Sequence, residues 1–274
     1  QVSGQVNISF TDKGTVLVGR DLAVEIVGDF ENSDSTILAG GDILFGSQHN
    51  NTGDFKSTGT IDSGGQLAVF ADTVLLKSGV FQSIDGMVIR TGDFESSGEG
   101  TIYSQGTVDI VGSESLINDA QIGSAESLKL ESENGILNDD AGTLIANGSI
   151  EIKSNSGGFV NKNTLVASVN ISIDTQKEIG NYGVINTSTG NISLVSKING
   201  VVNRDRILSG QHMDVRLGTT LDNGGVIDEN SPFFRDLTQV NNGCEDYMRY
   251  LENEISSFLS MNKKVGLLGG DHSV

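Results

Sequence analysis

The sequence repeats one short pattern about every 20 residues, and this repeat limits the possible folds more than any other feature. Each unit holds three short apolar runs, separated by Gly, Asn, Ser, Asp and Thr. One unit occupies residues 148–152, 158–161 and 164–168, and the next two units keep the same order. A period of this length predicts a solenoid, in which stacked coils bury one another's apolar side chains.

Aligning the units produces three columns of apolar residues. The units begin near Gly19, Gly41, Gly65, Gly86, Gly106, Glu126, Gly148, Val169, Gly190 and Gln211. In the first run apolar and polar residues alternate, which predicts a strand with one buried face. Only the unit at Gly86 departs from this, because Arg90 falls at an apolar position. The second column contains Phe30, Phe55, Leu76, Phe94, Leu116, Ile136, Phe159, Ile179, Val201 and Leu221. The third contains Ile37, Ile61, Phe81, Ile102, Ile122, Leu144, Leu165, Val184, Ile207 and Val226.

Three short strands per unit, each hydrogen-bonded in parallel to the next unit, predict an all-β fold: a parallel β-helix of about ten coils over residues 1–229. At about 4.8 Å per coil, ten coils give a rod on the order of 45 Å long. Residues 4–10 and 14–18 are predicted to form an opening coil that lacks its middle strand. Residues 230–274 are predicted to form a separate, small α/β segment.

An asparagine column follows the second apolar run in seven of the units. Its members are Asn32, Asn118, Asn138, Asn161, Asn181, Asn203 and Asn223. Asn tolerates the left-handed conformation of a tight corner, and stacked Asn amides can hydrogen-bond to one another. We therefore interpret the column as a structural ladder; a polar ligand-binding stripe is the alternative.

Composition argues against several functions. The 274 residues include 36 Gly, one Pro and no Trp, and the formal net charge is −19. This charge disfavours nucleic acid and anionic membranes as partners, since both attract basic patches. No apolar run reaches the about 18 residues of a membrane span. The single cysteine, Cys244, excludes an internal disulfide. Residues 1–20 lack a secretion signal, so we expect that an exported parent protein has lost its beginning here.

The pattern changes after Val226, and Pro232 lies at the junction. Residues 243–264 have helical periodicity, with one apolar face made of Tyr247, Leu251, Ile255, Phe258 and Leu259. An apolar strand at residues 265–268 precedes a Gly-rich turn with Asp271 and His272. This order is typical of an α/β enzyme and not of a solenoid.

The phrases at residues 32–43 and 59–67 resemble the repeats of filamentous-haemagglutinin-like exoproteins, which include two-partner-secretion adhesins and the sticks of contact-dependent-inhibition toxins. The resemblance covers residues 1 to about 229. It implies a right-handed parallel β-helix that is secreted or displayed on a bacterial surface and has no catalytic residues. It also implies that the partner is a host or neighbouring-cell surface, or an outer-membrane transporter of the two-partner type.

The motif Leu-Gly-Gly-Asp-His-Ser at residues 268–273 resembles the first metal-ligand signature of the ureohydrolase family (arginase, agmatinase and formimidoylglutamase). The resemblance covers about residues 233–274. It implies that His272 is a ligand in a two-manganese site that releases urea from a guanidino substrate. One His cannot hold two metal ions, and the family's downstream carboxylate motifs are missing. We therefore expect no cofactor and no catalysis in these residues, and Mn²⁺ only in a longer parent; a turn histidine is the alternative for His272.

The sequence thus predicts a structural or adhesive stalk of a bacterial exoprotein, with a manganese-dependent ureohydrolase carrying a repeat stalk as the rival interpretation. A third possibility is that two unrelated segments were joined near Pro232. A polysaccharide-cleaving β-helix is disfavoured, because the absence of Trp leaves few rings for stacking on sugars. The arginines also form no repeated column; those considered are Arg20, Arg90, Arg204, Arg206 and Arg216.

Overall fold

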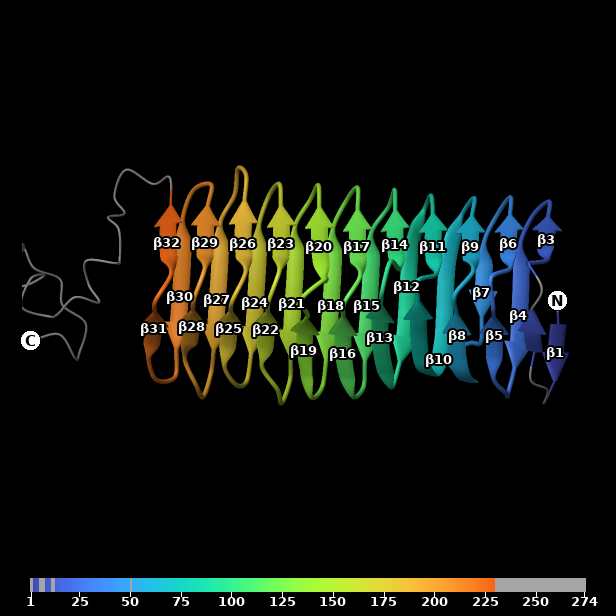
Figure 1. The fold of residues 1–274 in the computed structure, drawn as a ribbon, viewed down its shortest axis with the longest axis horizontal. Coiled ribbons are helices and arrows are strands. Elements are labelled where there is room, and N and C mark those ends of the chain that lie inside the picture. The colour runs from blue at the N-terminus through green and yellow to red at the C-terminus, as the bar shows by residue number, and fades with distance from the viewer. Residues whose placement is uncertain (1, 5–7, 11–12, 50, 230–274) are drawn as a thin grey trace, which may run out of the picture. The chain divides into compact units, whose positions relative to one another are not determined.

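The computed structural model describes residues 2–4, 8–10, 13–49 and 51–229, which form a right-handed parallel β-helix (Figure 1). All the regular elements among these residues are β-strands, β1 to β32. One of the sheets contains 11 strands, one from each coil, so the described residues make eleven coils. The predicted fold class is confirmed for this part of the chain.

Each coil contributes one strand to each of three faces, which we call sheets A, B and C. Sheet A contains β1 (Val2–Gly4), β4 (Leu22–Ile26), β7 (Ile43–Phe45), the first part of β10 (Gln66–Lys77), β12 (Gly86–Thr91), β15 (Val108–Gly112), β18 (Leu128–Ser132), β21 (Ile150–Ser154), β24 (Ile171–Thr175), β27 (Ile192–Ser196) and β30 (Met213–Leu217).

Sheet B contains β2 (Ile8–Phe10), β5 (Phe30–Asn32), β8 (Thr52–Ser57), the second part of β10, β13 (Asp93–Ser97), β16 (Ser115–Asn118), β19 (Gly135–Asn138), β22 (Phe159–Asn161), β25 (Ile179–Asn181), β28 (Val201–Asn203) and β31 (Leu221–Asn223). Because β10 continues from sheet A into sheet B, these two faces are joined by one unbroken strand.

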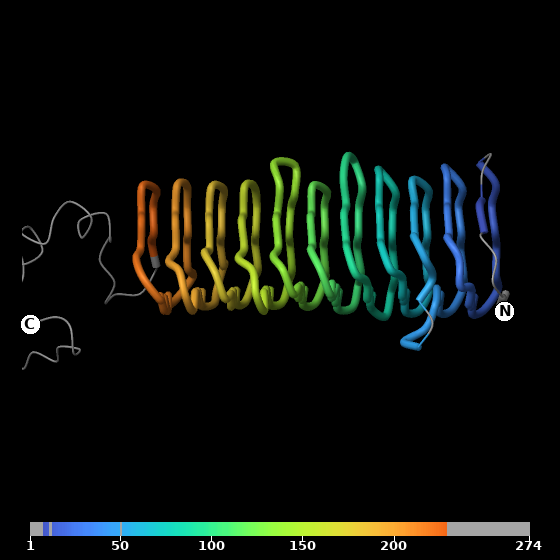
Figure 2. Tube along the Cα trace, turned by 90° about the horizontal axis from the view of Figure 1, so that it is seen from below, coloured from blue at the N-terminus to red at the C-terminus, as the bar shows by residue number. Residues whose placement is uncertain are grey.

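Sheet C contains β3 (Thr15–Val18), β6 (Thr36–Ala39), β9 (Thr60–Ser63), β11 (Val80–Ser83), β14 (Thr101–Ser104), β17 (Gln121–Ser124), β20 (Thr143–Ala146), β23 (Thr164–Ala167), β26 (Val184–Thr187), β29 (Arg206–Ser209) and β32 (Val226–Glu229). Figure 2 shows the coils as separate, regular turns, with one longer turn projecting between β7 and β8.

The core is a thin layer of aliphatic residues in each coil. Ile150 and Ile152 of β21 are buried with the Ile171 and Ile173 pair of β24, on which they stack. In the N-terminal coils the core is aromatic: the Phe30 and Phe55 rings stack with centroids 4.7 Å apart. Each layer buries few side chains, so its stability depends on contact with the neighbouring coil.

The structure corrects the predicted register at three coils. Phe55 pairs with Val74 and not with Leu76, which lies two residues further along the same buried face. In sheet C the inward residues are Ile185 and Ile227, so the predicted Val184 and Val226 face outward. The cause is that apolar residues one or two positions apart satisfy the sequence pattern equally, and only the neighbouring coil selects one of them.

The unit at Gly86 is regular in the structure. Met87 and Ile89 are buried and pair with Val108 and Ile110 of the next coil. The inward pair lies one residue earlier than predicted, so Arg90 points outward, where it pairs with Asp109. The opening coil is also complete: β1 is its first strand, and the predicted first strand around Ile8 is its second.

Candidate functional site

The corner at the end of sheet B holds the predicted asparagine column. From Asn118 to Asn223 the six asparagines occupy equivalent positions in six successive coils. Nδ2 of each of the first five donates to Oδ1 of the asparagine in the next coil, over 2.7–2.8 Å. The side chains from Asn118 to Asn203 are almost completely buried. The column is therefore a chain of amides that all point the same way along the axis.

Four of the ladder amides, from Asn138 to Asn203, also donate to backbone carbonyl groups at the corner. Nδ2 of Asn161 donates to the carbonyl oxygen of Asn163 at 3.1 Å, and to that of Val184 in the next coil at 3.2 Å. Nδ2 of Asn181 similarly reaches the carbonyl oxygen of Arg206 at 3.1 Å. These bonds satisfy backbone carbonyl groups that the change of direction removes from the strand ladder.

The structure gives a different explanation for the asparagines at this corner from the one expected from the sequence. Among the described residues, positive φ at non-glycine positions occurs at Lys13, Asp34 and Ser78. The ladder asparagines therefore do not adopt the left-handed conformation that the sequence argument invoked. Asparagine occupies these positions because its side-chain amide can both donate and accept a hydrogen bond.

Asn32 lies in the same column but outside the continuous ladder. Ser57, Leu76 and Ser96 occupy the three coils between Asn32 and Asn118. Nδ2 of Asn32 reaches Oγ of Ser57 only at 3.3 Å, and its buried Oδ1 has no hydrogen-bond partner. The coil before it supplies Phe10 at this position, which has no amide to donate.

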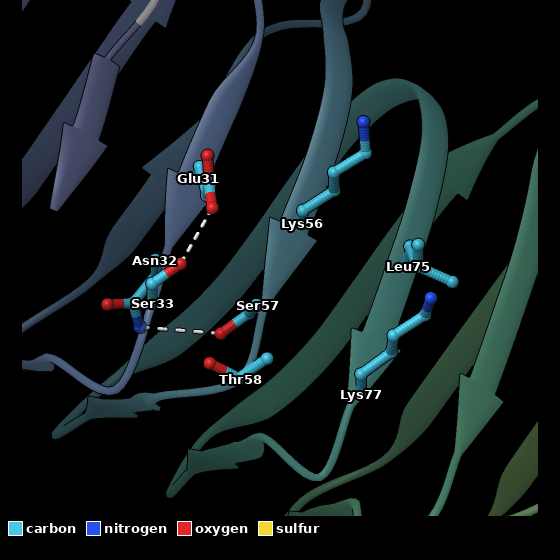
Figure 3. A pocket seen from close by; sticks show the side chains of 8 residues that line it. All are labelled: Glu31, Asn32, Ser33, Lys56, Ser57, Thr58, Leu75 and Lys77. Carbon is cyan, nitrogen blue, oxygen red and sulfur yellow. Dashed lines mark hydrogen bonds between the residues drawn. The ribbon is translucent and has the colours of Figure 1, made fainter. Parts of the chain in front are cut away.

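A shallow hollow of about 240 Å³ opens on sheet B beside Asn32 and Ser57. Figure 3 shows Asn32 directed toward Ser57, while Lys56, Leu75 and Lys77 project from the next two coils. Ser57 is shorter than the asparagine found at most other rungs, so this corner is less completely filled. The Lys56 ammonium lies 2.9 Å from a carboxylate oxygen of Asp54.

Hydroxyl columns at the other two corners were missed by the sequence reasoning. At the end of sheet A, Ser132, Ser154, Thr175 and Ser196 stack in register. The hydroxyls of Ser132, Thr175 and Ser196 donate to corner carbonyl groups, as in Ser132 to Glu114 at 2.7 Å, and Ser154 accepts from the backbone N–H of Gly157. At the end of sheet C, Ser83 donates to Ser104 at 2.9 Å. The signal was a small polar residue two positions after each inward apolar residue.

On the outer face of sheet B, five successive coils place apolar groups or glycine at the outward position just before the ladder residue. In register these are Ile117, Leu137, Val160, Gly180 and Val202. A Cβ added at Gly180 would lie 3.1 Å from Cε2 of Tyr182 and 3.8 Å from Cγ2 of Val160. The Tyr182 ring therefore fills the space above Gly180, and 49% of this residue is exposed.

Ion pairs on the outer faces are mostly local. Arg90, Arg204 and Arg216 each pair with an aspartate on the same or the adjacent coil. On sheet A, Glu131 lies between Lys153 at 2.8 Å and Lys129 at 3.1 Å. The hydrogen bond from Lys153, with help from Lys129 and against the effect of burial, lowers the pKa of Glu131 from 4.5 to about 2.

Several predictions concern residues outside the described part of the chain: Pro232, the helix at 243–264, Cys244 and the proposed manganese ligand His272. Within the described residues, no group of three or more His, Cys, Asp or Glu side chains is placed to hold a metal ion. None of the described segments is a helix that is long and apolar enough to cross a lipid bilayer.

The buried ladder, the shallow hollow and the apolar outer face are thus among the features available for function in the described residues between 2 and 229. Comparison with family models, with curated proteins and with solved structures finds no match for this chain.

Proposed function

We propose that residues 1–229 act as a structural and adhesive stalk that holds an attached segment or a bound partner at a distance from a surface. The observation that carries this proposal is the unbroken stacking of coils, with a hydrogen-bonded amide ladder through six of them. Such stacking gives a stiff rod, and ten steps of about 4.8 Å make it about 48 Å long.

The context that we propose for the stalk is a secreted or surface-displayed bacterial exoprotein of the haemagglutinin, adhesin or toxin-delivery type. Its support is the resemblance of the repeats at residues 32–43 and 59–67 to such exoproteins. The partners would be a host or neighbouring-cell surface, or an outer-membrane transporter of the two-partner type. The net charge of −19 keeps a long particle soluble outside a cell.

Two measurements test this proposal. Small-angle scattering on the full chain should give the cross-section of one β-helix and a rod of the expected length. Beads coated with the chain should then adhere to cultured mammalian or bacterial cells more strongly than beads coated with an unrelated acidic protein. If the particle is a rod that does not adhere to cells, only the spacer role would be supported. A compact particle would contradict the stalk itself.

A manganese-dependent ureohydrolase remains the second candidate for the parent protein, supported by the motif at residues 268–273. His272 would be a ligand of one metal ion, and carboxylates absent from this sequence would have to complete the site. The present chain should release no urea from arginine or agmatine when Mn²⁺ is added. Measurable turnover that a His272→Ala variant abolishes would show that the chain itself forms the site.

A further inference from the structure

The outer face of sheet B carries a narrow apolar row that runs along the rod axis. We define the apolar row as Ile117, Leu137, Val160 and Val202 together with Tyr182 over Gly180. The four aliphatic residues are half-buried, and Tyr182 is exposed. The row spans five coils, or about 19 Å at about 4.8 Å per step. It is one residue wide, because β22, β25 and β28 have a single outward position, and the second outward position of β16 and β19 is occupied by Ser115 and Gly135.

Carboxylates border the row on both sides at its N-terminal end. Glu114 and Glu133 are exposed at the turns that precede β16 and β19. Asp119, Asp139 and Asp140 follow the same two strands, and of these Asp139 is paired with Lys162 at 2.6 Å. At this end the row lies between two acidic borders, which are complementary to basic side chains on both sides of an apolar row. Beyond Leu137 the borders are mixed and include the exposed Lys162, Lys177 and Arg204.

We propose that this face docks an amphipathic α-helix of a partner protein, lying along the rod axis with apolar residues toward the row and with Lys or Arg on both sides of the part that covers Ile117 and Leu137. A helix advances about 5.4 Å per turn, close to the about 4.8 Å between coils. One apolar residue per turn therefore meets one rung of the row, and about 13 residues cover it. Helix-in-groove recognition uses the same spacing of anchors.

A second copy of the chain fits this face less well. Two such faces packed in parallel would bring Glu114, Glu133 and Asp140 close to the same groups of the other copy, which costs binding energy. The overall charge of −19 opposes the same contact at longer range. This inference does not depend on the stalk function proposed above.

The test uses the full chain and a labelled helical peptide of about 15 residues in which one face is Leu and its flanks are Lys. Fluorescence anisotropy should show saturable binding that weakens as salt is raised. A peptide with the same lysines but with Ala in place of Leu should have a Kd at least about tenfold higher, because the apolar contacts are lost. Equal binding of the two peptides would reduce the interaction to general attraction by an acidic protein and overturn the proposal.

Matched variants locate the site. Leu137→Asn combined with Val160→Thr should weaken binding of the Leu/Lys peptide about tenfold. Val166→Thr is the control, since Val166 is a half-buried outward residue on sheet C, in the same coil as Val160.

Charge variants test the acidic border. Glu114→Gln with Asp140→Asn should weaken binding and flatten its salt dependence, whereas Glu126→Gln at an exposed corner before sheet A should not. An equal loss with Val166→Thr, or no binding by the wild-type chain, would contradict the proposed surface.

Circular dichroism and urea unfolding of each variant check that a loss of binding is not caused by unfolding. The double variant replaces only outward side chains, so its coils should remain stacked. If it unfolds at lower urea, binding is compared at a temperature at which all variants are folded. Self-association of the wild-type chain that Leu137→Asn with Val160→Thr abolishes would assign the row to a second copy instead, and so would overturn the heterologous partner.

Discussion

The hydroxyl of Ser96 donates a 2.7 Å hydrogen bond to Oδ1 of Asn118, and this bond begins the amide ladder. The ladder asparagines from Asn118 to Asn203 each donate to the asparagine of the next coil toward the C-terminus, so the ladder has one direction. Leu76, one coil before Ser96, has no polar group and ends the column on that side. Amides aligned in this way polarise one another, so the loss of a middle rung should cost more than one isolated hydrogen bond.

Replacing the middle rung tests this cooperativity. Asn161→Ala should leave the Nδ2 donor of Asn138 and the Oδ1 acceptor of Asn181 without their ladder partners inside the core. Urea unfolding should then show a loss of about 2–4 kcal/mol in the free energy of unfolding. Asn32→Ala is the control, because its bond to Ser57 is long, and it should cost about 1 kcal/mol or less. Equal losses would mean that the ladder has no special role.

Filling the hollow at Ser57 should stabilise the N-terminal coils. In Ser57→Asn, the new amide would stand next to Asn32 in register and could accept from its Nδ2. Its own Nδ2 could reach the carbonyl oxygen of Gly59, which Ser57 already contacts at 3.3 Å. We expect a gain of about 0.5–1 kcal/mol, seen as a higher urea midpoint with an unchanged slope. Thr58→Asn, one residue along and exposed, should give no such gain.

The contact between Tyr182 and Gly180 can be measured by a double-mutant cycle. Tyr182→Ala should uncover the backbone at Gly180 and cost about 1 kcal/mol in unfolding free energy. Gly180→Val should destabilise the wild-type chain, because the tyrosine ring occupies the space of the new side chain. In the Tyr182→Ala background the same valine should be neutral or stabilising, since a β-branched residue suits a strand. Simple additivity of the two changes would contradict the contact.

Acid should weaken the helix partly through Glu131. Its lowered pKa, about 2 against an ordinary 4.5, means that the unfolded chain binds a proton at this site before the folded chain does. The stabilising contribution is complete above about pH 4.5 and is lost as the pH falls toward 2. Solvent screening of a surface pair limits it to about 1 kcal/mol.

Glu131→Gln should therefore lower the unfolding free energy near neutral pH and flatten its decrease between pH 5 and 2. The measurement is urea unfolding at several pH values, with Glu126→Gln at an exposed corner as the control. A variant whose acid profile matches that of the wild type would show that the two lysines beside Glu131 do not stabilise the fold.

The architecture could be predicted from the sequence because each repeat places the same types of residue at equivalent positions. Gly148, Asn170 and Asn191 stand at equivalent turns, and the strands after them begin with Ile150, Ile171 and Ile192 as the alternation predicts. The asparagines from Asn118 to Asn223 were identifiable for the same reason, since their spacing equals the coil length. Their structural role was predicted only in part: they form a ladder, but they do not adopt the left-handed backbone conformation that was expected.

The outer face could not be read from the sequence in the same way. Ile117, Leu137 and Val160 alternate with inward residues and look like a continuation of the core pattern. Tyr182 and Gly180 are two residues apart, and only the fold of the corner places the ring over the glycine. The hydroxyl columns were missed as well, because Ser and Thr also occur in many of the turns, so their regular places at the strand ends did not stand out.

The sequence by itself determined that this chain is a solenoid, how many coils it has within about one, and which corner carries amides. The tertiary structure alone decided whether Val74 or Leu76 sits beneath Phe55, and whether Val184 or Ile185 faces inward. The physical reason is that side chains on a strand alternate, so a shift of one residue reverses the buried face, and a shift of two leaves it unchanged but moves every neighbour. Local pattern permits both choices, and the packing of one coil on the next selects between them.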